Sequence, residues 1–404
     1  MPSSTPPNRT VPNRPVNVSA CRTPITDAYK GSLATVDVRD LAARVVVEAV
    51  ERAGVPAELV DDVVLGEVLQ GGGCIARYAA VAAGLPDDTP GLALNRQCAT
   101  GLTAVGTAAA NIAAGMDRVV VAGGAENMTQ SPISYTKAAF PYGIPERTIS
   151  PSHPDRPDAP NMNMMVTVGE NTAREVGISR ERSDDWAYHS HRKAVAAIDE
   201  GRFKEEIVAV EVTGWDGGLR TVDTDEHPRR DTSPERLARL RVLSGVPDGT
   251  VTAGNSSPIN DGAAALVLTS EDVALARGLE PLAYVRSWAA AGVDPARTGL
   301  APTVAIPRAA ERAGLSLADI DLHEINEAFA SMTVGCIEVL GLDPDAVNVN
   351  GGAVALGHPV GASGARLIVT LLHELRRRGG GIGCASLCAG GGMGGALVIE
   401  VPAP

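Results

Sequence analysis

Hydrophobic and polar positions along the chain alternate between strand-like and helix-like patterns. A strand-like run at 16–20 precedes an amphipathic helical pattern at 41–54, and a second strand-like run follows at 62–68. The same alternation resumes at Asp261 and continues to Val401. Alternation of this kind predicts mostly parallel sheets with helices on their faces. The chain is therefore predicted to adopt an α/β fold.

The same patterns predict further elements. Helices are predicted over 78–85, 100–114, 170–176, 183–198 and 361–378, and strands over 118–122 and 346–350. Gly123-Gly124 is predicted to form a turn after its strand, and Ser183 is predicted to cap its helix. Residues 129–165 are rich in Pro, Ser, Asn and Met without a clear period, which is typical of loops. A less regular region therefore interrupts the α/β pattern.

An internal repeat relates the two ends of the chain. AVERAG at 49–54 returns as AAERAG at 309–314, a shift of 260 positions, and ALVL at 265–268 resembles ALVI at 396–399. Two copies of one α/β unit are therefore predicted, with an insertion in the first copy. The predicted domains are 15–128 together with 260–280, an inserted loop domain at 129–259, and 281–404, after a flexible tail at 1–14.

The repeat places two reactive side chains at equivalent positions. The shift aligns Cys98 with His358, and each residue precedes a predicted helix. His358 lies between two runs of Gly and Ala in 351–366, where a strand-to-helix elbow is predicted. If the halves pack about a pseudo-twofold axis, a Cys and a His that face each other make a nucleophile and its base. The dipole of the following helix favours the thiolate of Cys98. A tight turn with an incidental His and a buried apolar Cys remain the alternatives.

Composition limits the class of protein. The 404 residues exceed one typical core, and 44% hydrophobic with 21% charged residues is typical of a water-soluble globular protein. No apolar run approaches the roughly 18 residues of a membrane helix, and the first residues lack a secretory pattern. The six cysteines have no zinc-site spacing, so reduced thiols in a cytoplasm and no metal site are expected. A net charge of −13 argues against a nucleic-acid partner.

A basic patch interrupts this acidic composition. It consists of Arg229, Arg230, Arg236, Arg239 and Arg241. These arginines outnumber the acidic residues of 226–241 and leave a local balance of +2. A solvated helix face is one interpretation, and a site for a phosphorylated ligand is the other.

Four ordered segments of the chain resemble the thiolases. They are LNRQCATGLTAV (94–105), HEINEAFA (323–330), GGAVALGHPVGASGAR (351–366) and CAGGGMGG (388–395). Weaker matches at 18–24, 122–128 and 253–265 extend the resemblance over nearly the whole chain. The resemblance implies the thiolase fold, in which two duplicated α/β halves pack as a five-layer αβαβα core with an inserted loop domain.

The resemblance also implies a reaction. Thiolases join two acyl-CoA units by a reversible Claisen condensation, with CoA as substrate or product and no other cofactor. By this resemblance Cys98 would carry the acyl group, His358 would activate it, and Cys388 would exchange the α-proton. His358 and a water on Asn326 would hold one oxyanion, and the backbone N–H groups of Cys98 and Gly390 would hold the other.

The resemblance further implies contacts to CoA and an oligomer. The insertion and nearby loops would hold the CoA moiety, with Ser257 near its pantetheine and Arg229 near its nucleotide, because arginine suits phosphate. The remaining predicted substrate contacts are Met165, Ala328 and Phe329. A homodimer or homotetramer that acts in fatty acid metabolism is expected.

Some positions depart from the pattern of acetoacetyl-CoA-specific thiolases. Such members often have His-Met where this chain has Met164-Met165, and a Met near Thr298. Acetyl-CoA C-acetyltransferase is the leading assignment, and a degradative 3-ketoacyl-CoA thiolase of longer or branched chains is the alternative. A ketoacyl-synthase-like enzyme would have a second His in place of Asn326 and would lack Cys388. A non-catalytic acyl-CoA-binding protein would lose one of the four reactive side chains, and the chain has kept all four.

Overall fold

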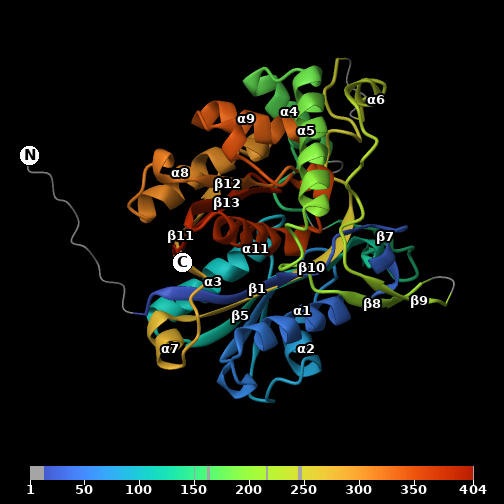
Figure 1. Cartoon of the computed structure of the whole chain (residues 1–404). Helices are drawn as coiled ribbons and strands as arrows, with labels where there is room; N and C mark the ends of the chain where they lie inside the picture. Colours follow the sequence, from blue (N-terminus) through green and yellow to red (C-terminus); the bar gives the residue numbers. More distant parts are fainter. Residues whose placement is uncertain (1–12, 150, 162–163, 215–216, 244–247, 404) are drawn as a thin grey trace, which may run out of the picture.

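The computed structural model describes residues 13–149, 151–161, 164–214, 217–243 and 248–403 (Figure 1). Residues 1–12 of the predicted tail lie outside this description. The main sheet has the strand order β12-β13-β14-β11-β1-β10-β5-β3-β4, and β2 (Thr26–Asp27) pairs with β10. The first half supplies β1 (Pro15–Arg22), β3 (Asp62–Gly66), β4 (Gly91–Leu94), β5 (Val119–Asn127) and β10 (Asn260–Ser270). The second half supplies β11 (Ala283–Gly292), β12 (Leu322–Ile325), β13 (Gly381–Ala389) and β14 (Met393–Val401).

The two halves repeat one strand arrangement. In the first, β3 is parallel to β5, β5 is antiparallel to β10, and β10 is antiparallel to β1. In the second, β12 is parallel to β13, β13 is antiparallel to β14, and β14 is antiparallel to β11. The two half-sheets meet where Val16 and Asn17 pair with Tyr284 and Ala283. The duplication predicted from the repeat is thereby confirmed.

Helices separate and cover the two half-sheets in layers. In the middle, α3 (Thr100–Ala114) packs against α11 (Val360–Arg377) (Figure 1). The outer face of the first half-sheet carries α1 (Val38–Ala53) and α2 (Ile75–Ala82). On the second half-sheet lie α8 (Pro302–Arg312) and α9 (Ala330–Leu340) (Figure 1). The predicted five-layer thiolase-type fold is therefore confirmed.

Glycine allows the two middle helices to touch. A Cβ on Gly101 of α3 would lie 2.9 Å from the Gly361 carbonyl oxygen, and one on Gly364 of α11 would lie 2.2 Å from the Leu102 nitrogen. Real Cβ atoms do not approach backbone this closely, so each position requires glycine. The small-residue runs thus bring the N-terminal turns of α3 and α11 together.

The prediction of a turn at Gly123-Gly124 is wrong. Both residues lie inside β5, in register with Ala265 and Ala264 of β10. A Cβ on Gly124 would lie 2.1 Å from the Gly361 carbonyl oxygen. Gly124 therefore serves the close approach of α11 to the sheet, and Gly123 serves the close approach of β10, where a Cβ would lie 2.0 Å from the Ala264 carbonyl oxygen.

Two other local predictions are also wrong. No strand forms over 346–350, where Asn348 instead exchanges side-chain hydrogen bonds of 2.8 Å with the backbone N–H and C=O of Ile325. A short helix, α10 (Ala353–Leu356), then leads to His358, so its elbow joins two helices. The cap of α5 (Arg180–Asp199) is Ser179, because the Ser179 side chain accepts the Arg182 N–H, whereas Ser183 lies in the first turn.

Between β5 and β10 the chain forms elements outside the main sheet. They are α4 (Met164–Val176), the long helix α5, α6 (Pro234–Ala238), the hairpin of β6 (Tyr135–Thr136) and β7 (Glu146–Arg147), and the hairpin of β8 (Val210–Thr213) and β9 (Leu219–Val222). After β10 comes α7 (Glu271–Ala276). In the described residues, no helix combines the length and the apolar character that a bilayer crossing requires.

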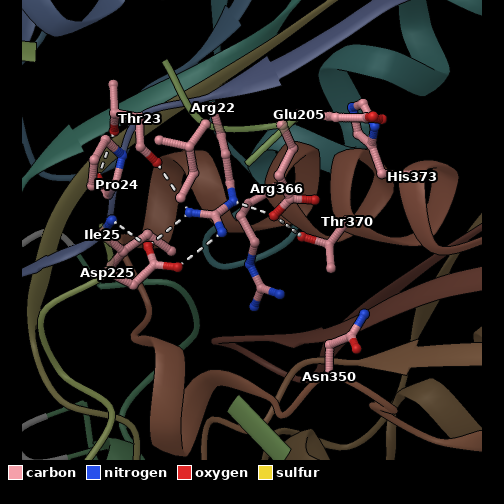
Figure 2. Close-up of polar contacts among 12 residues, drawn as sticks. Arg22, Thr23, Pro24, Ile25, Glu205, Asp225, Asn350, Arg366, Thr370 and His373 are labelled. Carbon is pink, nitrogen blue, oxygen red and sulfur yellow. Dashed lines mark hydrogen bonds and ion pairs between the residues drawn. The ribbon is translucent and has the colours of Figure 1, made fainter. Parts of the chain in front are cut away.

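A buried ion cluster ties this region to the core. Arg22, at the end of β1, donates its Nε to Glu206 at 2.6 Å and its two Nη atoms to Asp225 at 2.7 and 2.9 Å (Figure 2). Thr370 of α11 donates to the same Glu206 carboxylate at 3.1 Å. The Arg366 side chain extends into the same region from α11 (Figure 2). The cluster thus connects three separate segments, one of which is the helix that follows His358.

Asp225→Ala is expected to destabilise the fold by about 3–5 kcal/mol, because it leaves a fully buried guanidinium short of a carboxylate. The Ile25 N–H, which donates to Asp225 at 2.8 Å, also loses its acceptor. Urea unfolding measures the change. Asp223→Ala removes an exposed carboxylate nearby and is the matched control, with an expected change within about 0.5 kcal/mol. Equal values for both variants would contradict the prediction.

Candidate active site

Cys98 lies at the predicted elbow between β4 and α3. The chain turns through Gln97, whose φ of 49° is in the left-handed region, and the Arg96 N–H donates to Thr100 Oγ1 at 2.7 Å. Ala99 is the N-cap residue of α3, so Cys98 precedes the helix directly. The Cys98 side chain is buried at 5% exposure. The turn therefore holds the thiol inside the molecule, at the N-terminal end of a middle-layer helix.

His358 occupies the matching place before α11. Its backbone N–H donates to Asn260 Oδ1 at 2.9 Å, and its Nδ1 lies 2.6 Å from Ser363 Oγ. Because Ser363 Oγ donates its single hydrogen to the Pro359 carbonyl at 2.9 Å, Nδ1 is the nitrogen that carries the imidazole proton. His358 Nε2 then carries the lone pair, and the Asn326 amide donates to it over a long distance of 3.4 Å from Nδ2.

Burial keeps the His358 ring neutral. It lowers the pKa of His358 to about 3, and the nearby Arg366 guanidinium acts in the same direction. A neutral imidazole with an Nε2 lone pair accepts a proton and readily returns it. His358 is therefore equipped to act as a base that holds a proton only briefly.

Asn326 faces the same space from the end of β12. Its backbone N–H donates to the Ser386 carbonyl at 2.9 Å, which fixes it beside β13. The Asn326 Oδ1 is buried and accepts no hydrogen bond from the described residues. The neighbouring Glu327 accepts hydrogen bonds from Trp186 Nε1 at 2.8 Å and Ser190 Oγ at 2.7 Å. The Asn326 side chain thus extends from a fixed backbone, and its Oδ1 can accept a hydrogen bond from a water or a ligand.

Two cysteines and one glycine complete the constellation. Cys388 lies on β13, fully buried, and close enough to Cys98 for the two thiols to influence each other's charge. The backbone N–H groups of Gly390 and of Cys98 itself lie close enough to the Cys98 sulfur to lower the pKa of its thiol. These are the two amides that the sequence resemblance assigns to an oxyanion site.

The charge state of Cys98 differs from the prediction made from the helix dipole. Burial raises the pKa of its thiol to about 11, although the Gly390 and Cys98 amides lower it. The thiol therefore remains protonated at neutral pH, because removal from water outweighs the effect of the helix end. Such a thiol needs a base to become a nucleophile, and His358 has the Nε2 lone pair to serve.

The predicted substrate contacts fall into two groups. Ala328, Phe329 and Cys388 belong to one buried apolar cluster, against which Met165 packs. Ser257 joins this group because its N–H donates to the Ala328 carbonyl at 3.0 Å. The side chain of Met164 lies outside the described residues. Four predicted contacts thus lie in, or next to, the apolar cluster that also contains Cys388.

Arg229 lies apart from that group. Its side chain is exposed, its backbone N–H donates to His191 Nδ1 at 3.1 Å, and it lines a cavity of about 170 Å³. In the basic patch, Arg230 pairs with Asp199 and Arg236 pairs with Asp231. Within the described part of the chain, the other three arginines make no ion pair. Of these three, Arg229 lines the cavity, so its cationic side chain remains available at the cavity edge.

Sequence reasoning missed several groups that hold these side chains. Asn260 and Ser363 orient His358, and Glu126 accepts the N–H groups of Gly361 at 3.0 Å and Leu69 at 3.0 Å. Asn260 and Glu126 lie in segments whose resemblance was weak, and only Ser363 lies in a strong motif. No three His, Cys, Asp or Glu side chains of the described residues are grouped as metal ligands.

Known proteins share both the sequence and the fold. Residues 16–272 match the family model described as "Thiolase, N-terminal domain", and residues 279–401 match "Thiolase, C-terminal domain". The chain is 46% identical over 389 residues to a probable acetyl-CoA acetyltransferase of Escherichia coli (strain K12), covering 95% of this chain and 98% of that protein. It is 43% identical over 402 residues to a 3-ketoacyl-CoA thiolase of Bacillus subtilis (strain 168), covering 96% and 99%. The crystal structure of the Bacillus anthracis acetyl-CoA acetyltransferase superposes with a TM-score of 0.87 at 40% identity, covering 96% of this chain and 99% of that one.

Proposed function

The chain belongs to the thiolase family and is an acyltransferase, and from this we propose that it condenses acetyl-CoA with an acyl-CoA through an acyl-enzyme on Cys98. The products are a 3-ketoacyl-CoA and CoA, and the same site runs the reaction in reverse. The observation that carries the proposal is that Cys98 lies close to Cys388, that His358 lies beside Asn326, and that Cys98 and His358 precede two helices that pack against each other. Such an arrangement suits acyl transfer that is followed by carbon–carbon bond formation.

The first half-reaction loads Cys98. His358 Nε2 takes the Cys98 proton, and the resulting thiolate attacks the thioester carbonyl. The backbone N–H groups of Cys98 and Gly390 donate to the oxyanion that forms, an interaction of a kind that is typically worth about 2.7–4 kcal/mol per donor. CoA leaves as a thiolate and takes the proton of Cys388. The acyl group is then on Cys98, and Cys388 is a thiolate.

The second half-reaction forms the carbon–carbon bond. The Cys388 thiolate removes an α-proton from acetyl-CoA, and the enolate oxygen accepts hydrogen bonds from the protonated His358 and from a water held by Asn326. The enolate carbon attacks the acyl carbonyl on Cys98, and the Cys98 sulfur leaves. That sulfur recovers its proton from His358, so every group returns to its starting state.

Acetyl-CoA C-acetyltransferase is the proposed activity within the family. Support comes from two relatives at 46% identity, which are named acetyl-CoA acetyltransferase and probable acetyl-CoA acetyltransferase. Because a relative at 43% identity is named 3-ketoacyl-CoA thiolase, a thiolase that acts on longer or branched acyl groups is the second candidate. Met165 and Phe329 would contact the acyl group, because both border the apolar cluster around Cys388. The adaptable thioether of Met165 favours some tolerance in acyl size.

Thiolysis assays test the activity and the acyl preference together. The protein is mixed with CoA and acetoacetyl-CoA, or with medium- and long-chain 3-ketoacyl-CoA thioesters, and loss of the ketoacyl-CoA absorbance is followed. We expect turnover in the presence of both substrates, with the highest kcat/KM for acetoacetyl-CoA. A higher kcat/KM for longer thioesters would replace the acetyl assignment, and no CoA-dependent turnover of any thioester would refute the enzyme.

The assignment of CoA contacts, assembly and location is also part of the proposal. Residues 129–259 would hold the CoA moiety, with its phosphates near Arg229 and its pantetheine near Ser257. The β6–β7 hairpin exposes Phe140, Tyr142 and Ile144, which supports a homodimer or homotetramer. The six free cysteines support a reducing, cytoplasmic compartment. The relative named 3-ketoacyl-CoA thiolase supports a role in fatty acid metabolism.

A further inference from the structure

Thr298 contacts the loop that carries the Gly390 amide. It lies in the short 3-10 helix that follows β11 (Pro295–Leu300) and is 1% exposed. Its Oγ1 accepts the Gly392 N–H at 2.9 Å and donates to the Pro295 carbonyl at 2.6 Å. The hydroxyl is therefore fully engaged between its own backbone turn and the loop.

The loop consists of glycines, so it has no side chains of its own that could anchor it. It joins β13 to β14 through Gly390, Gly391 and Gly392, and the last two have φ values of 88° and 75°. Glycine in these conformations is free to move between several backbone states. The Gly392 carbonyl accepts the Val293 N–H at 2.7 Å, so the Gly392 residue is bonded on both its N–H and its C=O. Of these two anchors, only the N–H bond is made by a side chain.

The position of this anchor bears on the reacting thiol. Gly390 lies two residues before Gly392, and its backbone N–H is near enough to the Cys98 sulfur to lower the pKa of that thiol. Donors to a developing oxyanion are effective when their orientation is fixed before the reaction begins. A three-glycine loop that lost one of its end contacts would let that amide rotate.

We propose that Thr298 is a positioning residue, which fixes the Gly390 N–H as an oxyanion donor by anchoring the Gly392 N–H. The proposal rests on the thiolase activity proposed above, because the donor acts on an acyl group carried by Cys98. Thr298 touches neither the thiol nor the imidazole, so its effect passes through the glycine loop. A merely structural role would instead lower stability without a selective effect on acyl transfer.

Two reactions of Cys98 separate these roles. Acetylation by acetyl-CoA creates an oxyanion at the carbonyl, whereas alkylation by iodoacetamide displaces iodide from a saturated carbon and creates none. The rate of acetylation is measured as the burst of CoA release, and the rate of alkylation as the loss of that burst. Wild-type turnover of acetoacetyl-CoA with CoA is confirmed first, so failure of the proposed activity appears before any variant is compared.

Thr298→Val keeps the side-chain shape and removes the hydroxyl. We expect the ratio of acetylation rate to alkylation rate to fall roughly tenfold, less than the 10²–10³-fold typical of deleting an oxyanion donor. Thr298→Ser keeps the hydroxyl and should restore the ratio. If the Val variant does not fold, Thr298→Ala removes the hydroxyl with less bulk and carries the same expectation.

Thr303→Val is the matched control. Thr303 lies in the first turn of α8, donates to the Leu300 carbonyl at 2.7 Å and makes no hydrogen bond to the glycine loop. Its ratio should equal that of the wild type. If the ratio of acetylation to alkylation is unchanged in Thr298→Val, the positioning role is overturned. This holds whether both rates stay at the wild-type level or both fall by the same factor.

Discussion

Replacing Cys98 with alanine is expected to lower kcat/KM for thiolysis of acetoacetyl-CoA by about 10⁴-fold or more, the scale reached when a covalent nucleophile is removed. The remaining groups bind and polarise a thioester but have no atom on which to carry the acyl group. The fold itself should be retained, because the substitution removes a single sulfur atom from a buried side chain and leaves the backbone unchanged.

The measurement pairs steady-state thiolysis with intact-protein mass spectrometry after incubation with acetyl-CoA. The wild type should gain one acetyl group and Cys98→Ala should gain none. Cys384→Ala is the matched control, because Cys384 is a fully buried thiol on β13, outside the constellation described above. An acetylated Cys98→Ala protein, or a Cys384→Ala variant as inactive as Cys98→Ala, would show that the acyl group is carried elsewhere.

The fold was largely predictable because the chain contains its α/β unit twice. The repeat of 49–54 at 309–314 pairs the ends of the equivalent helices α1 and α8, and both halves then build the same strand order. Local patterns failed where tertiary contacts decide the structure. Gly123 and Gly124 resemble a turn, yet they stay in β5, because a Cβ on Gly123 would collide with Ala264 of β10 and a Cβ on Gly124 would collide with Gly361 of α11. The contact with α11 involves a segment more than two hundred residues away.

The site was predictable only in part. Cys98, His358, Asn326 and Cys388 were singled out by ordered motifs, and the folded chain pairs His358 with Asn326 and Cys98 with Cys388. The ionisation of Cys98 was not predictable, because its burial arises from the packing of both halves and opposes the local effect of the helix end. In the sequence, Thr298 was distinguished only because it departs from a family pattern. Its hydrogen bond to Gly392 depends on the contact between the segment after β11 and the β13–β14 loop, which the sequence does not reveal.

Replacing Cys388 with serine is expected to separate the two half-reactions. Burial, together with the neighbouring Cys98 and Cys336, raises the pKa of the Cys388 thiol well above its usual value. Its thiolate is therefore a strong base, and in the proposed cycle it forms only when the departing CoA takes its proton. A serine hydroxyl is a much weaker acid than a thiol, so the corresponding base does not form at this step. Condensation should fall by about 10²–10⁴-fold, the usual contribution of a positioned acid or base.

Acetylation of Cys98 should survive in Cys388→Ser, because attack on the thioester depends on His358 and on the two backbone amides. Two measurements on the same preparation distinguish the steps. The burst of CoA release reports acetylation, and exchange of the acetyl-CoA methyl hydrogens with deuterated water reports α-proton transfer. We expect a preserved burst and a loss of exchange that matches the loss of condensation. If exchange persisted at the wild-type rate, another group would have to remove the α-proton, and if burst and exchange fell together, Cys388 would support the whole site rather than one proton transfer.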